Sequence, residues 1–171
     1  AALGRGDVRL TDHATLTYRN VSGDNQQDIA VIGTQISGTQ SSYLNVENSA
    51  LYLQGDNNGF EGALVIDDLS RVTMDQFGLI SGNINNEGAL TFDINEGVKT
   101  YRGQLTGRGI FTKLGGGTLA FEQSQHYSGD IEIKQGALRI DSGITYQTDA
   151  TLYIDQEGML TLLDQSLVSA T

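Results

Sequence analysis

The sequence predicts an all-β fold and, within that class, a parallel β-helix, in which the chain winds into stacked coils. Three observations support this prediction. Short segments alternate apolar and polar residues, and the segments resemble one another. They are separated by Gly, Asn and Asp rather than by Pro: the chain has 22 Gly and no Pro. Apolar residues at positions i and i+2 lie on one face of a strand. No stretch of about ten residues or more shows the 3.6-residue period of a helix convincingly.

The expected strands are short and follow one another closely. In chain order, the clearest cover residues 44–46, 51–53, 64–66, 72–74, 90–92, 119–121, 131–133, 138–140, 152–154 and 160–162. A strand of this length with one apolar face cannot bury that face alone. If each coil lies ~4.8 Å above the last, the apolar side chains form one continuous core, and Gly and Asn fit the corners because they tolerate positive φ.

A small residue followed by Leu recurs along the chain. The leucines of this pattern are Leu16, Leu51, Leu64, Leu90, Leu119, Leu138, Leu152 and Leu160. Their spacing is irregular, which fits a solenoid with loops of variable length, and roughly 20–25 residues per coil would give about seven or eight coils. The alternative is a β-sandwich or jelly roll. Such folds favour Asn-Gly or Asp-Gly hairpins, of which the chain has only Asn58-Gly59, so we prefer the solenoid.

Composition excludes several classes of protein. The 171 residues include 10 Lys and Arg against 21 Asp and Glu, a net charge of −11, so we expect no nucleic-acid partner. No apolar run approaches the ~18 residues of a membrane-spanning helix, so we expect no membrane insertion. Without Cys there is no disulfide scaffold, thiol nucleophile or cysteine-based zinc site. We expect a single β-helical segment over residues 1–171. Its first residues, which lack Met and a leader pattern, suggest an excised or processed piece.

The stretch 107–141 carries a more specific pattern. A Gly-x-Gly strand leads through Lys and a glycine-rich turn to Thr-Leu, then to Tyr-Ser-Gly and Gly-Ala-Leu. The residues of this motif are Gly107, Gly109, Lys113, Gly115, Gly117, Thr118, Leu119, Tyr127, Gly129, Gly136 and Leu138. The stretch resembles the passenger-associated repeat of bacterial autotransporters (type V secretion). Gln125-His126 stands where that repeat usually has Asn-Thr, which puts an asparagine ladder at this corner in question.

The resemblance implies a right-handed parallel β-helix belonging to a passenger that is exported across the outer membrane to the bacterial cell surface or beyond. It implies a non-catalytic stalk or adhesin acting in attachment or self-association. The expected partners are host-cell surface or matrix molecules, the same passenger on neighbouring cells, and flanking coils of the full-length passenger. Two alternatives stay open: support for a serine-protease domain elsewhere in the protein, and a β-helical carbohydrate-active enzyme.

Catalytic, metal and cofactor sites are not expected. Asp141-Ser142-Gly143 matches only part of a serine-protease motif, and a base would have to be His13 or His126. A carbohydrate-active enzyme would need clustered carboxylates. The candidates are Asp67, Asp68, Asp93 and Glu132. The segment 56–59 has the wrong spacing for a calcium loop.

Two surface features could bind a partner. Arg5-Gly6-Asp7 is an adhesion-type tripeptide that an integrin-like receptor could bind if it is exposed, although three such common residues also meet by chance. The seven tyrosines could form an adhesive or sugar-stacking stripe if they face outward, or pack in the core with hydrogen-bonded hydroxyls.

Overall fold

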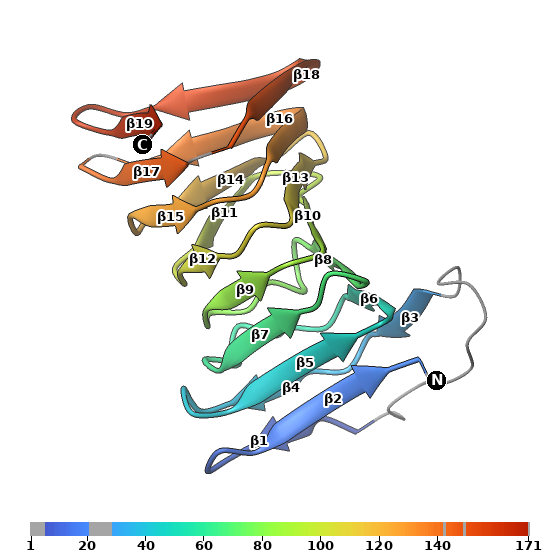
Figure 1. Ribbon diagram of the computed structural model, residues 1–171. Coiled ribbons are helices and arrows are strands. Elements are labelled where there is room, and N and C mark those ends of the chain that lie inside the picture. Colours follow the sequence, from blue (N-terminus) through green and yellow to red (C-terminus); the bar gives the residue numbers. More distant parts are fainter. Residues whose placement is uncertain (1–5, 21–28, 142, 149, 171) are drawn as a thin grey trace.

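The structure is a computed structural model that describes residues 6–20, 29–141, 143–148 and 150–170. The described residues form strands and turns without a helix, and the strands stack into a β-solenoid of about six turns (Figure 1). Every strand pair among them is parallel, with each strand lying beside the equivalent strand of the next coil. The prediction of a parallel solenoid is therefore confirmed. The sandwich alternative is wrong, because it requires antiparallel hairpins.

The coils have three faces. Face A contains β3 (Ile29–Ile32), β6 (Ala50–Leu53), β8 (Arg71–Asp75), β10 (Ala89–Asp93), β13 (Ile110–Leu114) and the first parts of β16 (Ile131–Ile140) and β18 (Leu152–Leu162). Face B contains β1 (Val8–Leu10), β4 (Ile36–Gly38), β11 (Val98–Tyr101), β14 (Thr118–Phe121) and the second parts of β16 and β18. Face C contains β2 (Thr15–Arg19), β5 (Tyr43–Glu47), β7 (Ala63–Ile66), β9 (Ile84–Asn86), β12 (Leu105–Thr106), β15 (Gln125–Tyr127), β17 (Thr145–Thr148) and β19 (Leu167–Ala170).

The period of the solenoid is nearly constant along face A. Ile29 pairs with Ala50, which in turn pairs with Arg71, so two successive coils have the same length. The later coils of this face repeat at nearly the same interval, from Ala89 to Ile110 and from Ile131 to Leu152. The step from Thr15 to Tyr43 on face C is longer, because the chain between them includes residues 20–28. The small-Leu pattern looked irregular because it combined leucines of different faces.

Side chains that point inward stack in columns from coil to coil. Leu44, Leu64, Ile84 and Leu105 occupy one such column on face C, and all are fully buried. Full burial of such a side chain stabilises the fold by roughly 1.5–3 kcal/mol. Aromatic rings pack against one another in the C-terminal half of the core with centroids 5.5–6.0 Å apart, mostly tilted or edge to face; the rings are those of Phe92, Tyr101, Phe111, Phe121 and Tyr146.

The C-terminal coil leaves part of this core uncovered. Ile154 and Leu162 in β18 are 49% and 48% exposed, whereas their register partners one coil earlier, Ile133 and Ile140, are fully buried. The inward-facing side chains are therefore of the same kind in both coils, and only the covering layer differs. This coil forms one end of the solenoid in Figure 1.

Candidate functional site

The glycines of the 107–141 motif lie where successive coils come closest. A Cβ added at Gly107 would lie 2.1 Å from the carbonyl oxygen of Asn86, and Gly107 has a φ of +110°. A Cβ at Gly136 would lie 2.3 Å from the carbonyl oxygens of both Gly115 and Gly117, at a φ of +66°. Real side chains essentially never approach backbone atoms this closely, so both positions require glycine.

Tyr127 ties the coils together at the corner between faces C and A. Its buried hydroxyl donates a hydrogen bond to the carbonyl oxygen of Gly109 at 2.7 Å and accepts one from Nδ2 of Asn86 at 2.7 Å. The same Nδ2 donates to the carbonyl oxygen of Ile110 at 3.0 Å. Burial raises the pKa of Tyr127 well above its usual range, although the Asn86 hydrogen bond opposes the shift. Gly107 lies between Asn86 and Tyr127 in the sequence of coils, and its lack of a side chain lets its backbone approach the backbone of Asn86.

Lys113 is a buried cation at the bend between faces A and B. Its Nζ donates to the carbonyl oxygens of Leu114 and Gly115, both at 2.7 Å, and of Gln135 at 3.1 Å. Burial lowers the pKa of Lys113 from 10.5 to about 8, while the nearby carboxylate of Asp93 acts in the opposite direction. The lysine thus supplies hydrogen bonds to bend carbonyls of two successive coils.

The other motif residues also serve the stacking. Leu119 and Leu138 are register partners with buried side chains, and Thr118 is half-buried at the start of β14. Gln125 is buried: its Oε1 accepts from the Leu105 amide at 2.7 Å, and its Nε2 donates to the Gly103 and Gln123 carbonyl oxygens at 3.0 Å. A glutamine therefore makes the corner hydrogen bonds at the position where the resembling repeat usually has asparagine.

This geometry, in which motif residues bond coil to coil, is that of a structural repeat. Residues 111–140 match the family model of the passenger-associated-transport-repeat. The resemblance drawn from the sequence is thereby confirmed. No curated protein and no solved structure matches the chain significantly. The matched model describes a repeat and not a catalytic domain.

Asn86 is a part of the repeat's bonding that the sequence did not reveal. It lies one coil before the matched residues and faces inward from β9, two positions after buried Ile84. The feature of the sequence that could have indicated this role is the amide side chain of Asn86 at an inward position of an otherwise apolar strand. Buried amides need partners, so such a residue indicates a specific hydrogen-bond network.

The adhesion-type tripeptide lies at the N-terminal end of the solenoid. Arg5 lies outside the described residues, whereas Gly6 and Asp7 are exposed just before β1. The structure therefore leaves binding by this tripeptide as a prediction.

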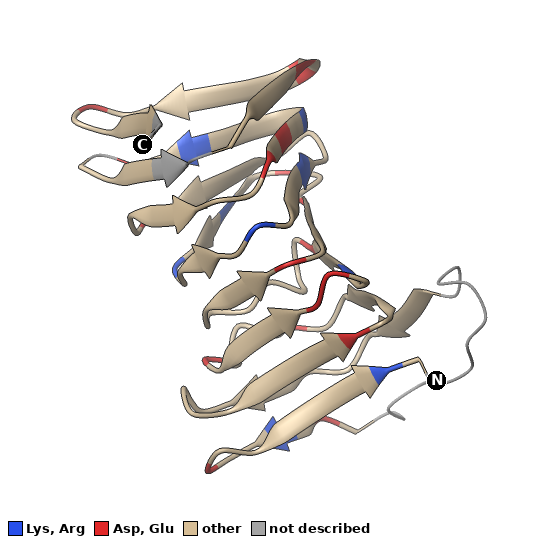
Figure 2. Cartoon of the chain, in the orientation of Figure 1, with Lys and Arg blue, Asp and Glu red and all other residues tan. Residues whose placement is uncertain are grey.

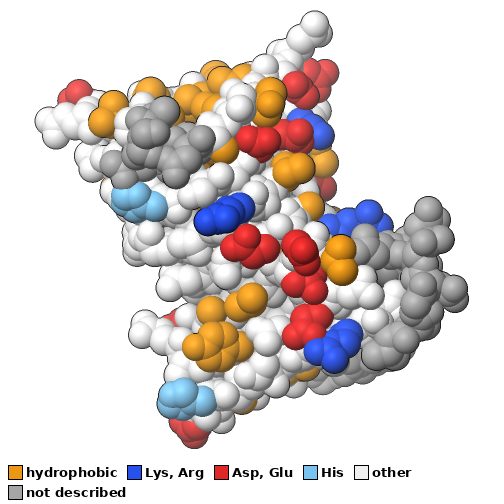
Figure 3. Space-filling model, viewed as in Figure 1, with side chains coloured by type: hydrophobic (Ala, Val, Ile, Leu, Met, Phe, Trp, Pro, Cys, Tyr) orange, Lys and Arg blue, Asp and Glu red, His pale blue; other side chains and the backbone are white. Residues whose placement is uncertain are grey.

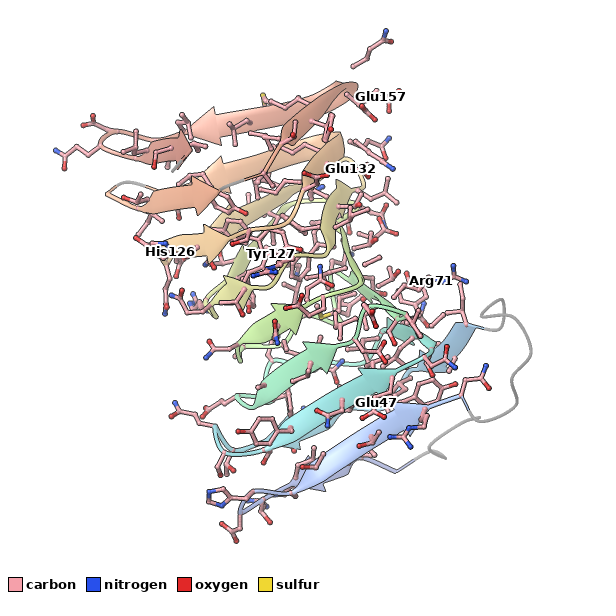
Figure 4. The ribbon with its side chains drawn as sticks, in the orientation of Figure 1. Glu47, Arg71, His126, Tyr127, Glu132 and Glu157 are labelled. Carbon is pink, nitrogen blue, oxygen red and sulfur yellow. The ribbon has the colours of Figure 1, made fainter. Side chains whose placement is uncertain are left out.

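The residues considered for catalysis do not converge. Ser142 lies outside the described residues, His13 is in an exposed turn before β2, and His126 is on the outer surface of β15 (Figure 4). Glu132 pairs with Lys134 at 2.9 Å and accepts from Thr112. Within the described part of the chain, no three His, Asp or Glu side chains are placed to hold a metal ion.

The candidate carboxylates mostly serve local structure. Asp67 accepts hydrogen bonds from the Asn48 and Leu69 amides at a turn. Asp93 lies beside Asp75 on the neighbouring strand β8. Glu132 lies two coils further on and is in register with Thr91 rather than with Asp93, so these two carboxylates are not neighbours. The sequence alone does not place Asp75 beside Asp93, because it does not show which strands of successive coils pair.

Charged residues lie mainly at turns and strand ends (Figure 2). Acidic side chains form a band across the ends of β5, β7 and β9 (Figure 3), where the sequence has Glu47, Asp67, Asp68 and Glu87. Arg19 forms an exposed ion pair with Glu47, which contributes little to stability. The described residues contain no helix able to cross a membrane.

The tyrosines do not form one surface stripe. Tyr101, Tyr127 and Tyr146 are buried, while the exposed Tyr43 and Tyr153 lie on different faces. Tyr101 donates to the carbonyl oxygen of Gly82 at 2.9 Å, so its hydroxyl is used inside the core. An adhesive role shared by all the tyrosines is therefore excluded by their burial.

Proposed function

We propose that the chain is a non-catalytic β-helical segment of an autotransporter passenger, acting as a stalk or adhesin at the bacterial cell surface. The observation that supports this most is the match of residues 111–140 to a passenger repeat inside a regular solenoid. Two of the three motif residues with polar side chains, Lys113 and Tyr127, donate hydrogen bonds to carbonyl oxygens of a neighbouring coil. This distribution fits a part whose task is to build a rod.

A stack of coils provides a simple mechanism for such a part. Each coil adds ~4.8 Å, so about six turns project a surface over roughly 30 Å. Outward positions repeat at the same spacing on each face, which suits weak contacts made many times over. Several weak contacts on one rod gain avidity through their high effective concentration. The proposed partners are host-cell surface or matrix molecules, or the same passenger on a neighbouring cell.

Flanking coils of the same polypeptide are the proposed partners of the solenoid end. The exposed inward-facing Ile154 and Leu162 continue columns that are fully buried one coil earlier. A further coil of the same length and register would cover them, as β18 covers β16. The rod would then continue beyond β18 and β19.

The test compares three versions of the full-length protein displayed on bacteria: unaltered, lacking residues 6–170, and lacking residues 50–70. The last deletion removes one coil and joins Ser49 to Arg71, which preserves the register of face A. An adhesin predicts loss of clumping or host-cell attachment with the large deletion and near-normal attachment with the one-coil deletion. Normal attachment without residues 6–170 would contradict the adhesin role and leave a spacer.

The enzyme alternative has its own readout. A carbohydrate-active segment would release reducing ends or unsaturated products from acidic polysaccharides, and replacement of Asp75 or Asp93, the adjacent carboxylates, would abolish the release. We expect no turnover by the unaltered protein. Turnover sensitive to either substitution would contradict the non-catalytic proposal.

A further inference from the structure

The turn of residues 56–59, between β6 and β7, combines a buried, hydrogen-bonded Asn57 with the exposed dipeptide Asn58-Gly59. Asn57 and Phe60 are buried, whereas Asn58 and Gly59 are exposed between them. Oδ1 of Asp56 accepts hydrogen bonds from the Asn58 amide at 3.3 Å and from Asn58 Nδ2 at 3.1 Å. This is the chain's single Asn-Gly sequence. Glycine after asparagine leaves the next backbone nitrogen unshielded by a side chain.

We infer that Asn58 is a site of spontaneous intramolecular deamidation, assisted by Ser81 of the next coil. Ser81 Oγ donates a hydrogen bond to the Asn58 carbonyl oxygen at 2.6 Å. That carbonyl belongs to the peptide bond of the Gly59 nitrogen, so the bond stabilises the negative charge that forms when this N–H loses its proton. Among the described residues, the Gly59 N–H has no hydrogen-bond acceptor that would hold the proton. Gly59 also lines an open hollow, which gives water and hydroxide access.

The reaction needs only water and a base. Hydroxide removes the Gly59 amide proton, and the nitrogen attacks Cγ of Asn58. The new N–Cγ bond closes a five-membered succinimide, the Cγ–Nδ2 bond breaks, and nitrogen leaves as ammonia after protonation by water. A second water opens the ring at either carbonyl and leaves aspartate or isoaspartate, with no change of oxidation state.

The products act on a part of the turn that holds the coils together. Asn57 Oδ1 accepts from the Ile36 amide at 2.8 Å, and its Nδ2 donates to the Gly78 carbonyl oxygen at 3.3 Å. The Gly59 carbonyl oxygen accepts from the Gly38 amide at 3.1 Å. Isoaspartate adds one methylene to the backbone between these anchors. Aspartate leaves the backbone unchanged, although it replaces the exposed hydrogen bond from Asn58 Nδ2 to Asp56 with two neighbouring carboxylates. The isoaspartate form should therefore loosen the N-terminal coils and leave the repeat at 111–140 intact.

The test incubates the folded protein at mildly alkaline pH and follows each asparagine by peptide mapping and isoaspartate detection. We expect Asn58 to be modified well ahead of the exposed Asn95, which precedes Glu96. Gly59→Ala should reduce the rate at Asn58 to that of Asn95. A Cβ at Gly59 meets only Ser37, at 3.4 Å, so this variant should fold. Modification of Asn58 no faster than that of Asn95 in the folded protein would overturn the inference.

A second comparison isolates the contribution of Ser81. Ser81→Ala should slow the reaction about fivefold in the folded protein, the loss expected for one ordinary hydrogen bond. In urea, where the contact with Asn58 is absent, the same substitution should have no effect. An equal effect in both states, or none in the folded state, would refute the role of Ser81. Asn58→Asp, which carries the aspartate product, should lose less stability than the isoaspartate form, because its backbone is unchanged and the lost Asn58–Asp56 hydrogen bond is exposed.

Discussion

Replacement of Lys113 by Met should change how the free energy of unfolding depends on pH. The fully buried ammonium has a pKa of about 8 in the folded protein, against 10.5 for an ordinary lysine. Above about pH 8 the folded state has released this proton while the unfolded state still holds it. Stability therefore rises with pH until about 10.5, because the unfolded state binds more protons.

The size of the effect follows from the two pKa values. A lowering from 10.5 to about 8 corresponds to about 3 kcal/mol over the whole range, of which about 2 kcal/mol should appear between pH 7 and 9.5. The Met variant keeps a long apolar side chain and lacks this term. It also removes the donor to the Gly115 and Gln135 carbonyl oxygens, which costs about 1–3 kcal/mol for each acceptor left unsatisfied, at every pH.

The assay is urea unfolding of the unaltered protein and Lys113→Met at several pH values from 7 to 9.5. The unaltered protein should gain stability relative to the variant as pH rises. Ionisation of tyrosines affects both proteins equally and cancels in the difference. Lys134→Met is the matched control: Lys134 is exposed, and its hydrogen bond to Glu132 raises its pKa, so its contribution should stay level across this range. Parallel profiles for the unaltered protein and Lys113→Met would refute the reasoning.

Two further substitutions test the packing of the repeat by urea unfolding at neutral pH. Tyr127→Phe should lower the free energy of unfolding by about 1–3 kcal/mol because Asn86 and Gly109 lose their partner, whereas Tyr43→Phe at the surface should change it by less than about 0.5 kcal/mol. Gly136→Ala should be more destabilising than Gly97→Ala, since the two φ angles are +66° and +67° but only the Gly136 methyl would meet backbone oxygens. If the two variants of either pair lost the same free energy of unfolding, the buried contact of that pair would contribute nothing to stability.

The sequence was sufficient for the class of fold, and the coil length of face A lies within the expected range, but the pattern of leucines did not reveal the period itself. Alternation within 64–66 and 90–92 predicted strands that β7 and β10 confirm, because one-sided burial constrains every second residue. The period was hidden because the small-Leu pattern occurs on several faces. Leu51 faces inward on face A and Leu64 on face C of the same turn, so the interval between them measures only part of a coil.

The bonding inside the repeat was harder to predict, because its polar members occupy positions that alternation assigns to apolar residues. Lys113 lies between buried Phe111 and the glycine-rich bend, and its role is visible only when the carbonyls of two coils are in place. Gln125 follows the same logic at another corner. In both cases at least one partner, such as the Gln135 carbonyl oxygen or the Leu105 amide, is a backbone group about one coil away, which local sequence patterns do not reveal.

For the adhesin proposed above, this internal use of the motif determines which positions are free to contact a partner. Glycines at close contacts, together with buried Lys113 and Tyr127, maintain the distance between coils, so changes there act first on stability. The outward positions of the same strands, such as Ile110 in β13 and His126 in β15, have exposed side chains and carry no such constraint. A repeat of this kind can keep one motif while its surface changes. Substitutions at outward positions should therefore alter attachment without altering unfolding, and substitutions within the motif should alter both.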